Sequence, residues 1–387
     1  KCGLVMLARE MITVQMNIGA VCDPQSAAPT GVDGVLGCHC TSVSSSFAQG
    51  TLTHFVASTT RPTAVNNGTL PMSINAFADG VEPLDMTSLA EFESLVQSAS
   101  DLEIPHGADV RYVSRNLVAR QHRFHLLEWG NADASKLFML HGGHQSAHSW
   151  DLVSLNLAQR YHVFTPDQRG HGDSEWARDC AYTNEDMAND AAGLISALSL
   201  DRPVVVGHSM GGRNALMMAL AHPNICRALV IVDVGPEISD EGRRTIGSFV
   251  RANEEFEDLD HFVENVRRYD PYRSREHIER TVKYNLFLRA DGKYVSKCDR
   301  APRKLGLHDR QGGVDRLSLE AVAAIDVPVL VVRGANSNIL AADAAERFVD
   351  ALPNGELVTV PECGHNVHSQ NTLGFIEAVS GFLERVA

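Results

Sequence analysis

Residues 203–212, with the sequence PVVVGHSMGG, restrict the choice of folds more than any other segment. Three consecutive valines predict a short buried strand, and the alanine- and methionine-rich segment that follows predicts a helix. A strand that turns sharply into a helix holds the intervening serine on a strained bend, where flanking glycines prevent side-chain collisions. Ser209 therefore lies beside the first free N–H groups of a helix, and it is the candidate nucleophile.

Two further motifs accompany this one in chain order. An apolar run at residues 137–140 leads into His141-Gly142-Gly143, where a backbone N–H can face a developing oxyanion. A second run at residues 357–360 precedes Gly364-His365. The serine motif alone could be a glycine-rich turn with an inert hydroxyl, since such short patterns often arise by chance. Three motifs in this order, each after a predicted strand, favour a catalytic site.

From about Arg111 to the C-terminus, the chain resembles α/β-hydrolases of the lidded serine esterase type. The motifs that carry the resemblance are HGG at 141–143, DQRGHGDS at 167–174, GHSMGG at 207–212, VDVGPE at 232–237 and Gly364-His365. They are specific to the superfamily and not to one substrate. The resemblance implies an α/β fold, in which a mostly parallel α/β-hydrolase sheet is flanked by helices and carries an inserted helical cap.

The distribution of residue types agrees with this organisation. Residues 1–85 are rich in Ser, Thr, Gly, Ala and Pro without periodicity, so we expect a low-complexity, flexible extension. From residue 110 onward, predicted strands alternate with helices, which favours a mostly parallel sheet covered on both faces. We assign residues 86–235 and 314–387 to the α/β-hydrolase core.

Residues 236–313 interrupt the alternation. The segment has no β-runs and contains amphipathic stretches, so we predict a helical cap. The resemblance places such caps over the active site. A helical domain unrelated to the pocket is the alternative, but the entry and exit of the segment lie at strand ends on the catalytic side.

Composition excludes several classes of partner. Acidic residues outnumber basic ones by 48 to 34 in the 387 residues, and the net charge of -14 repels nucleic acid and anionic lipid. The eight cysteines lack the paired spacing of a zinc site. No apolar run is long enough for a transmembrane segment, and no convincing signal peptide is present, so we expect a cytoplasmic protein. We expect a small-molecule ester substrate and neither cofactor nor metal; the oligomeric state stays open.

The chemistry predicted for Ser209 requires a base and an anion-binding site. A neutral imidazole must take the serine proton, and His365 is singled out among 17 histidines by its place after the last strand and by the flexible glycine before it. The N–H groups of Gly143 and Met210 form the predicted oxyanion hole. His208, inside the serine motif, is predicted to line the pocket.

The third member of the triad is ambiguous. The resemblance places an acid after the seventh strand in a Gly-x-x-x-Asp pattern, and the aligned residue here is Asn338. One alternative is Asp233, which ends the sixth strand, where some α/β-hydrolases carry their acid. The other is that Asn338 orients His365 without charge, as asparagine does in papain-like enzymes. We favour Asp233.

The run at residues 167–174 resembles a site but has a simpler explanation. Asp167, Arg169 and Asp173 are predicted to hold the loop after the fourth strand through local hydrogen bonds, without a catalytic role.

The leading functional interpretation is a carboxylic-ester hydrolase that works through an acyl-enzyme. A carbon–carbon bond hydrolase acting on a diketone is the alternative within enzymes, because GHSMGG and a lid suit both reactions. A binding protein that has lost its charge relay is an alternative from a different class, and Asn338 is the residue that raises it.

Overall fold

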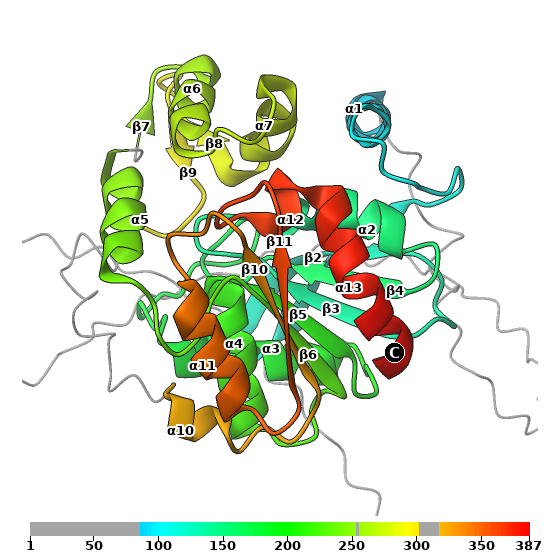
Figure 1. Cartoon of the computed structure of the whole chain (residues 1–387). Helices are drawn as coiled ribbons and strands as arrows, with labels where there is room; N and C mark the ends of the chain where they lie inside the picture. The colour runs from blue at the N-terminus through cyan, green and yellow to red at the C-terminus, as the bar shows by residue number, and fades with distance from the viewer. Residues whose placement is uncertain (1–85, 253–254, 302–316) are drawn as a thin grey trace, which may run out of the picture. The chain divides into compact units, whose positions relative to one another are not determined.

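The computed structural model describes residues 86–252, 255–301 and 317–387 (Figure 1). Among these residues, an eight-stranded sheet has the order β1-β2-β4-β3-β5-β6-β10-β11. Its first strands pair antiparallel, β1 with β2 and β2 with β4, and the remaining pairs are parallel. The strands are β1 Tyr112–Ala119, β2 His122–Trp129, β3 Lys136–Leu140, β4 His162–Pro166, β5 Val204–His208, β6 Ala228–Val232, β10 Val329–Gly334 and β11 Gly355–Val360. The predicted α/β fold with a mostly parallel sheet is confirmed.

The central strands have no exposed face. Every residue of β5 and of β6 is buried, as expected for short apolar runs in a parallel sheet that is covered on both sides. Alternate side chains of β5 enter different layers: Val204 and Val206 belong to one apolar cluster, and Val205 to the other.

Helices cover the two faces of the sheet (Figure 1). Side chains of α1 Met86–Asp101, α2 Asp151–Leu157 and α13 Thr372–Val386 pack in the cluster with Val204 and Val206. Side chains of α3 Asn184–Ala197, α4 Met210–Ala221, α10 Leu319–Val322 and α11 Ala342–Ala351 pack in the cluster with Val205. The short helices η2 Ala147–Trp150 and α12 Val367–Gln370 lie in loops that follow strands β3 and β11.

The segment between β6 and β10 differs from the helical cap predicted for residues 236–313. It contains the helices α5 Asp240–Ala252, α6 Leu259–Tyr269, α7 Arg275–Val282 and η3 Lys283–Asn285, but also the strands β7 Glu255–Phe256, β8 Leu286–Leu288 and β9 Tyr294–Ser296. These strands form an antiparallel sheet in the order β7-β9-β8. The prediction of a segment without strands is wrong, because runs of two or three residues are too short for a period of two to be recognised.

The inserted segment has its own small apolar cluster and is attached to the core by polar contacts. Arg280 on α7 pairs with Asp151 on α2 at 3.1 Å, and both side chains are buried. The ring of Tyr284 stacks on His148 with a centroid distance of 3.6 Å. Beyond β9, Lys297 pairs with Asp173 at 2.6 Å.

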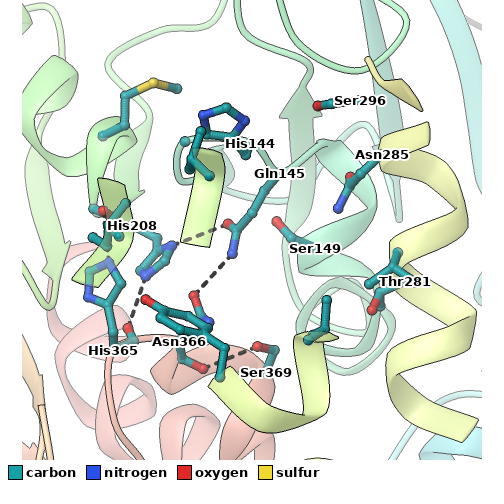
Figure 2. A pocket seen from close by; sticks show the side chains of 18 of the residues that line it. His144, Gln145, Ser149, His208, Thr281, Asn285, Ser296, His365, Asn366 and Ser369 are labelled. Atoms are coloured by element: carbon teal, nitrogen blue, oxygen red, sulfur yellow. Dashed lines mark hydrogen bonds between the residues drawn. The ribbon is translucent and has the colours of Figure 1, made fainter. Parts of the chain in front are cut away.

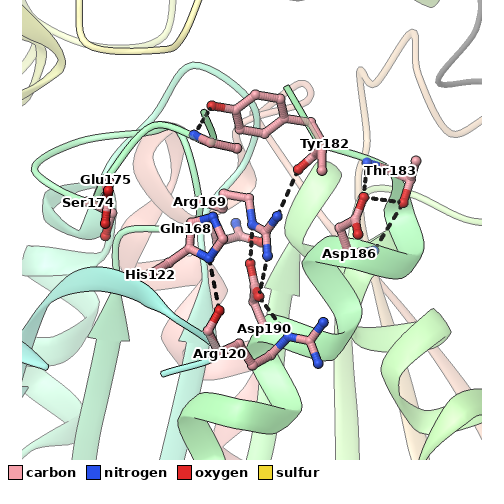
Figure 3. A network of polar contacts seen from close by, with 12 residues as sticks. Arg120, His122, Gln168, Arg169, Ser174, Glu175, Tyr182, Thr183, Asp186 and Asp190 are labelled. Carbon is pink, nitrogen blue, oxygen red and sulfur yellow. Dashed lines mark hydrogen bonds and ion pairs between the residues drawn. The ribbon is translucent and has the colours of Figure 1, made fainter. Parts of the chain in front are cut away.

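The loop after β4 has the structural role predicted for residues 167–174. Arg169 makes two hydrogen bonds to Asp190 on α3, at 2.6 and 2.7 Å, and Arg120 joins the same carboxylate (Figure 3). Burial acts to raise the pKa of Asp167, but the hydrogen bond and charge of His125 outweigh it and hold that pKa at about 2.

Some expectations fall outside the described residues. These are the flexible extension at residues 1–85 and the end of the cap near residue 313. Among the described helices, none has both the length and the apolar character needed to span a bilayer.

Candidate active site

Ser209 occupies a sharp turn between β5 and α4. Its φ is +50°, a left-handed conformation that is strained for a residue with a side chain. A Cβ on Gly207 would lie 2.5 Å from the carbonyl oxygen of Gly211, and one on Gly211 would lie 2.4 Å from that of Leu140. The two glycines of the motif therefore allow β5, the start of α4 and the end of β3 to approach closely.

The structure brings Ser209 and His365 together, although 156 positions separate them in the sequence. Ser209 Oγ lies 2.9 Å from His365 Nε2, a distance at which the hydroxyl donates to the ring. His365 lies in the loop between β11 and α12 and is 8% exposed. The geometry is that of a serine and its general base.

Asp233 is the acidic neighbour of the imidazole. Its Oδ2 lies 2.8 Å from His365 Nδ1, so the ring donates from Nδ1 and presents the lone pair of Nε2 to Ser209. Asp233 is fully buried, and its Oδ1 accepts the N–H of Gly334 at 3.0 Å. The hydroxyl of Ser337 donates to Oδ2. A buried carboxylate with these donors stays oriented toward the ring.

Asn338, the alternative third member, does not contact His365. It is exposed, and its backbone carbonyl accepts a hydrogen bond from the Ser239 hydroxyl. The preceding residue, Ser337, donates a hydrogen bond to Asp233, whereas Asn338 is exposed. The structure thus places Asp233, and not Asn338, at His365.

Sequence reasoning missed a glutamine that joins two loops of the site. Gln145 Nε2 donates to Asn366 Oδ1 at 3.2 Å, and Gln145 Oε1 lies 3.2 Å from His208 Nδ1 (Figure 2). Gln145 Oε1 also accepts the N–H of Gly142 at 2.9 Å. The loop after β3 is thereby connected to the residue that follows His365. A single glutamine outside any motif gives no signal in a sequence, and the same is true of Ser337.

His208 contacts the loop that carries His365. Its Nε2 lies 3.0 Å from the carbonyl oxygen of His365. Burial, together with the neighbouring His368 and His365, holds the pKa of His208 well below its usual value. The ring is therefore neutral and has a single N–H, and each of its nitrogens lies within hydrogen-bond distance of an acceptor, Nε2 of the His365 carbonyl and Nδ1 of Gln145 Oε1. His208 also lines the pocket, as predicted.

The two residues predicted for the oxyanion hole lie close together. A Cβ on Gly143 would lie 3.9 Å from Met210 Sδ and 4.0 Å from Met210 Cβ. Met210 is the first residue of α4, so its N–H has no acceptor within the helix. Both residues line the pocket that contains Ser209.

This pocket has a volume of about 380 Å³ and is lined from two sides. The core contributes Ser209, Met210 and His365. The inserted segment contributes apolar and polar residues, which are Ile246, Val250, Phe262, Val266, Tyr269, Arg273, Thr281, Val282, Asn285, Leu286, Ser296 and Arg300. A substrate at Ser209 would therefore contact the insertion.

A metal site would need three or more free ligand atoms close together. Among the described residues, the atoms that meet this spacing belong to His125, Asp167 and Asp173. Asp167 already accepts the N–H groups of Ala147 and Asp173, and Lys297 pairs with Asp173. These contacts make the group a closed network that stabilises the loop after β4.

Comparison with known proteins agrees with this architecture. A model of the alpha/beta hydrolase fold family matches residues 137–372. The esterase Rv0045c of Mycobacterium tuberculosis is 29% identical over 309 residues, which are 78% of this chain and 98% of that protein. A solved structure of that esterase has a TM-score of 0.62 at 25% identity, with 79% of this chain and 99% of the other covered.

Two hydrolases of other kinds are also similar. The 2-(acetamidomethylene)succinate hydrolase of Mesorhizobium japonicum is 26% identical, with 74% of this chain and 99% of that protein covered. The 2-hydroxymuconate semialdehyde hydrolase of a Pseudomonas species is 26% identical, with 70% of this chain and 94% of that protein covered.

Proposed function

We propose that this chain, which belongs to the α/β-hydrolase fold family, is a serine hydrolase that cleaves carboxylic esters through an acyl-enzyme intermediate. The observation that carries the proposal is the unbroken hydrogen-bonded series from Ser209 through His365 to Asp233, at 2.9 and 2.8 Å. The series opens into a pocket large enough for a small ester. The similarity to an esterase along most of both chains supports the same reaction.

The reaction would proceed in two halves. Ser209 Oγ attacks the ester carbonyl while its proton moves to His365 Nε2. The N–H groups of Gly143 and Met210 stabilise the oxyanion of the tetrahedral intermediate. His365 then returns the proton to the leaving alcohol, and an acyl ester remains on Ser209. Water, deprotonated by His365, repeats the sequence and releases the acid.

Asp233 acts on the charged state of the ring. When His365 carries two protons, the buried carboxylate lies next to a full positive charge, which stabilises the imidazolium. The donors from Gly334 and Ser337 keep Asp233 oriented toward the ring. Asn338 stands where the resemblance places an acid, which raised the alternative of a binding protein. Because Asp233 contacts His365, Asn338 is not needed for the proposed charge relay.

Release of p-nitrophenol from short-chain esters tests the proposal. Turnover by the wild type and its loss in Ser209→Ala are expected, because the serine forms the covalent bond. A fluorophosphonate probe should label the wild type and not Ser209→Ala. Ser296→Ala is the matched control, since Ser296 lines the same pocket, and it should keep both activity and labelling. Hydrolysis that persists in Ser209→Ala would refute the proposal.

A carbon–carbon bond hydrolase remains the second candidate. The resemblance of the chain to 2-hydroxymuconate semialdehyde hydrolase supports it. Turnover of a vinylogous diketone together with failure on esters would favour this reaction. Turnover of esters alone would favour the first.

A further inference from the structure

The charges in the pocket wall do not follow the charge of the whole chain. The chain has a net charge of -14, yet no described residue that lines the pocket is Asp or Glu. Three arginines line it, namely Arg213, Arg273 and Arg300. A neutral ester needs no cation in its pocket, so the arginines indicate a substrate that carries a negatively charged group.

Arg273 has the geometry of an anchored ligand-binding residue. Its Nε donates to Asp270 Oδ2 at 2.7 Å, and its Nη1 donates to Thr281 Oγ1 at 3.3 Å. Its side chain is 9% exposed, and Asp270 is fully buried. Within the described part of the chain, Nη2 makes no hydrogen bond, although Arg273 lines the cavity.

The ion pair with Asp270 does not use all of the hydrogen-bond donors of Arg273. Asp270 occupies Nε and lies outside the pocket wall, so it fixes the plane of the guanidinium and leaves Nη donors unused. A guanidinium fixed in this way presents parallel donors with the spacing of carboxylate oxygens. Asp270 offsets part of the positive charge, so recognition would depend mainly on these directed donors.

Further polar atoms in the wall have no partner among the described residues. They are the hydroxyl of Ser149 and Oδ1 of Asn285, both buried. Figure 2 shows Ser149, Asn285 and Thr281 on the side of the view opposite His208 and His365. Thr281 accepts a hydrogen bond from Nη1 of Arg273. Buried polar groups without partners are costly unless a ligand or an ordered water satisfies them.

We infer that the substrate carries a carboxylate, which binds the free donors of Arg273 while the scissile carbonyl lies at Ser209. Ser149 and Asn285 serve other polar groups of the same molecule. The inference rests on the proposed function, and it names an acidic acyl compound as the substrate class. It applies equally to an acyl–oxygen and an acyl–carbon bond.

The test compares p-nitrophenyl half-esters of adipic, pimelic and suberic acid with their primary amides, which have the same shape and no charge. For the wild type, we expect kcat/KM on at least one carboxylate to exceed that on its amide by about tenfold to a hundredfold, the range for a hydrogen bond to a charged group. The length with the largest ratio reports the separation of Arg273 from Ser209.

A variant then assigns the preference to Arg273. Because Arg273→Gln alone leaves Asp270 unpaired, the variant is Asp270→Asn/Arg273→Gln. We expect the ratio of kcat/KM on the carboxylate to kcat/KM on the amide to fall to about one. Arg268→Gln is the control, since Arg268 is exposed on α6 and does not line the pocket.

The possible results separate the two proposals. If the wild type hydrolyses the amides as well as the carboxylates at every length, the inference is wrong and the serine esterase stands. If no ester is cleaved and the fluorophosphonate probe does not label Ser209, both are wrong. If the preference survives in the double variant, the carboxylate site lies elsewhere and the assignment to Arg273 fails. Should that variant not fold, the wild-type comparison still decides the substrate class.

Discussion

The parallel sheet and the inserted segment contribute to the pocket in different ways. Ser209, Asp233 and His365 follow β5, β6 and β11, so all three lie at the carboxyl end of the sheet. The three side chains are hydrogen-bonded in series, and Asp233 also accepts the N–H of Gly334 at the end of β10. The insertion, by contrast, has a small apolar cluster and strands of two or three residues.

Under the proposed function, the sheet positions the reacting groups, and the insertion lines much of the pocket that would hold the substrate. Ser209 and Asp233 follow β5 and β6, in which every residue is buried, whereas His365 follows the edge strand β11. The insertion supplies much of the remaining pocket wall, including Arg273. Its polar contacts with the core include Arg280 with Asp151 and Lys297 with Asp173.

The largest effect is expected from a change that removes the carboxylate of Asp233. Asp233→Asn should lower kcat on p-nitrophenyl esters by about 10⁴-fold, the loss seen for the equivalent change in serine proteases, because the amide favours the wrong tautomer of His365. Asn338→Ala should leave kcat unchanged within the error of the assay. The reverse ranking of the two variants would refute the assignment of Asp233.

The next effect concerns the attachment of the insertion. Arg280→Met should lower the free energy of unfolding by about 3–5 kcal/mol, because it leaves Asp151 buried without its cation. Urea denaturation at neutral pH measures this. The double variant Arg280→Met/Asp151→Leu should recover most of the loss.

Arg275→Met is the matched control on the same helix. Arg275 pairs with Glu279 and Asp260 at partly exposed positions, so its removal should cost about 0–1 kcal/mol. Equal losses for Arg280→Met and Arg275→Met would mean that the buried pair does not hold α7 to the core.

A smaller effect tests the connection between the loops of the site. Gln145→Leu removes the hydrogen bonds to Gly142 and Asn366 and should lower kcat about tenfold, equivalent to one or two hydrogen bonds of about 1 kcal/mol. Steady-state kinetics on an ester measure it. Gln159→Leu, at an exposed position, is the control. An unchanged kcat would show that the loops keep their positions without Gln145.

The smallest effect depends on pH. Burial, with the charges of Arg273 and His365, lowers the pKa of His368 from 6.5 to about 3. The unfolded chain therefore binds a proton between these values that the folded protein does not, so His368 lowers stability as the pH falls from 6.5 toward 3. His368→Leu should cost about 1 kcal/mol at pH 7, through lost contact with Trp150, and should be the more stable form near pH 5.

Urea denaturation at the two pH values measures this crossing. His261→Gln, at an exposed position on α6, should show no such dependence. A difference between wild type and His368→Leu that stays constant with pH would contradict the burial of a neutral ring.

The sequence alone was sufficient where local chemistry decides the structure. The valine run before Ser209 and the glycines around it determine a strand, a strained turn and a helix, since each property belongs to adjacent residues. The position of His365 after a late strand followed from the order of elements. Alternating strands and helices likewise predicted the parallel sheet.

Tertiary structure decided the rest, because the answer depends on residues distant in the chain. Whether Asp233 or Asn338 reaches the imidazole depends on how the ends of β6 and β10 lie beside each other, and the register of the sheet sets this. Gln145 and Ser337 gained their contacts only when loops from different strands met. The short strands of the insertion and the free donors of Arg273 are also consequences of packing, which periodicity and composition do not encode.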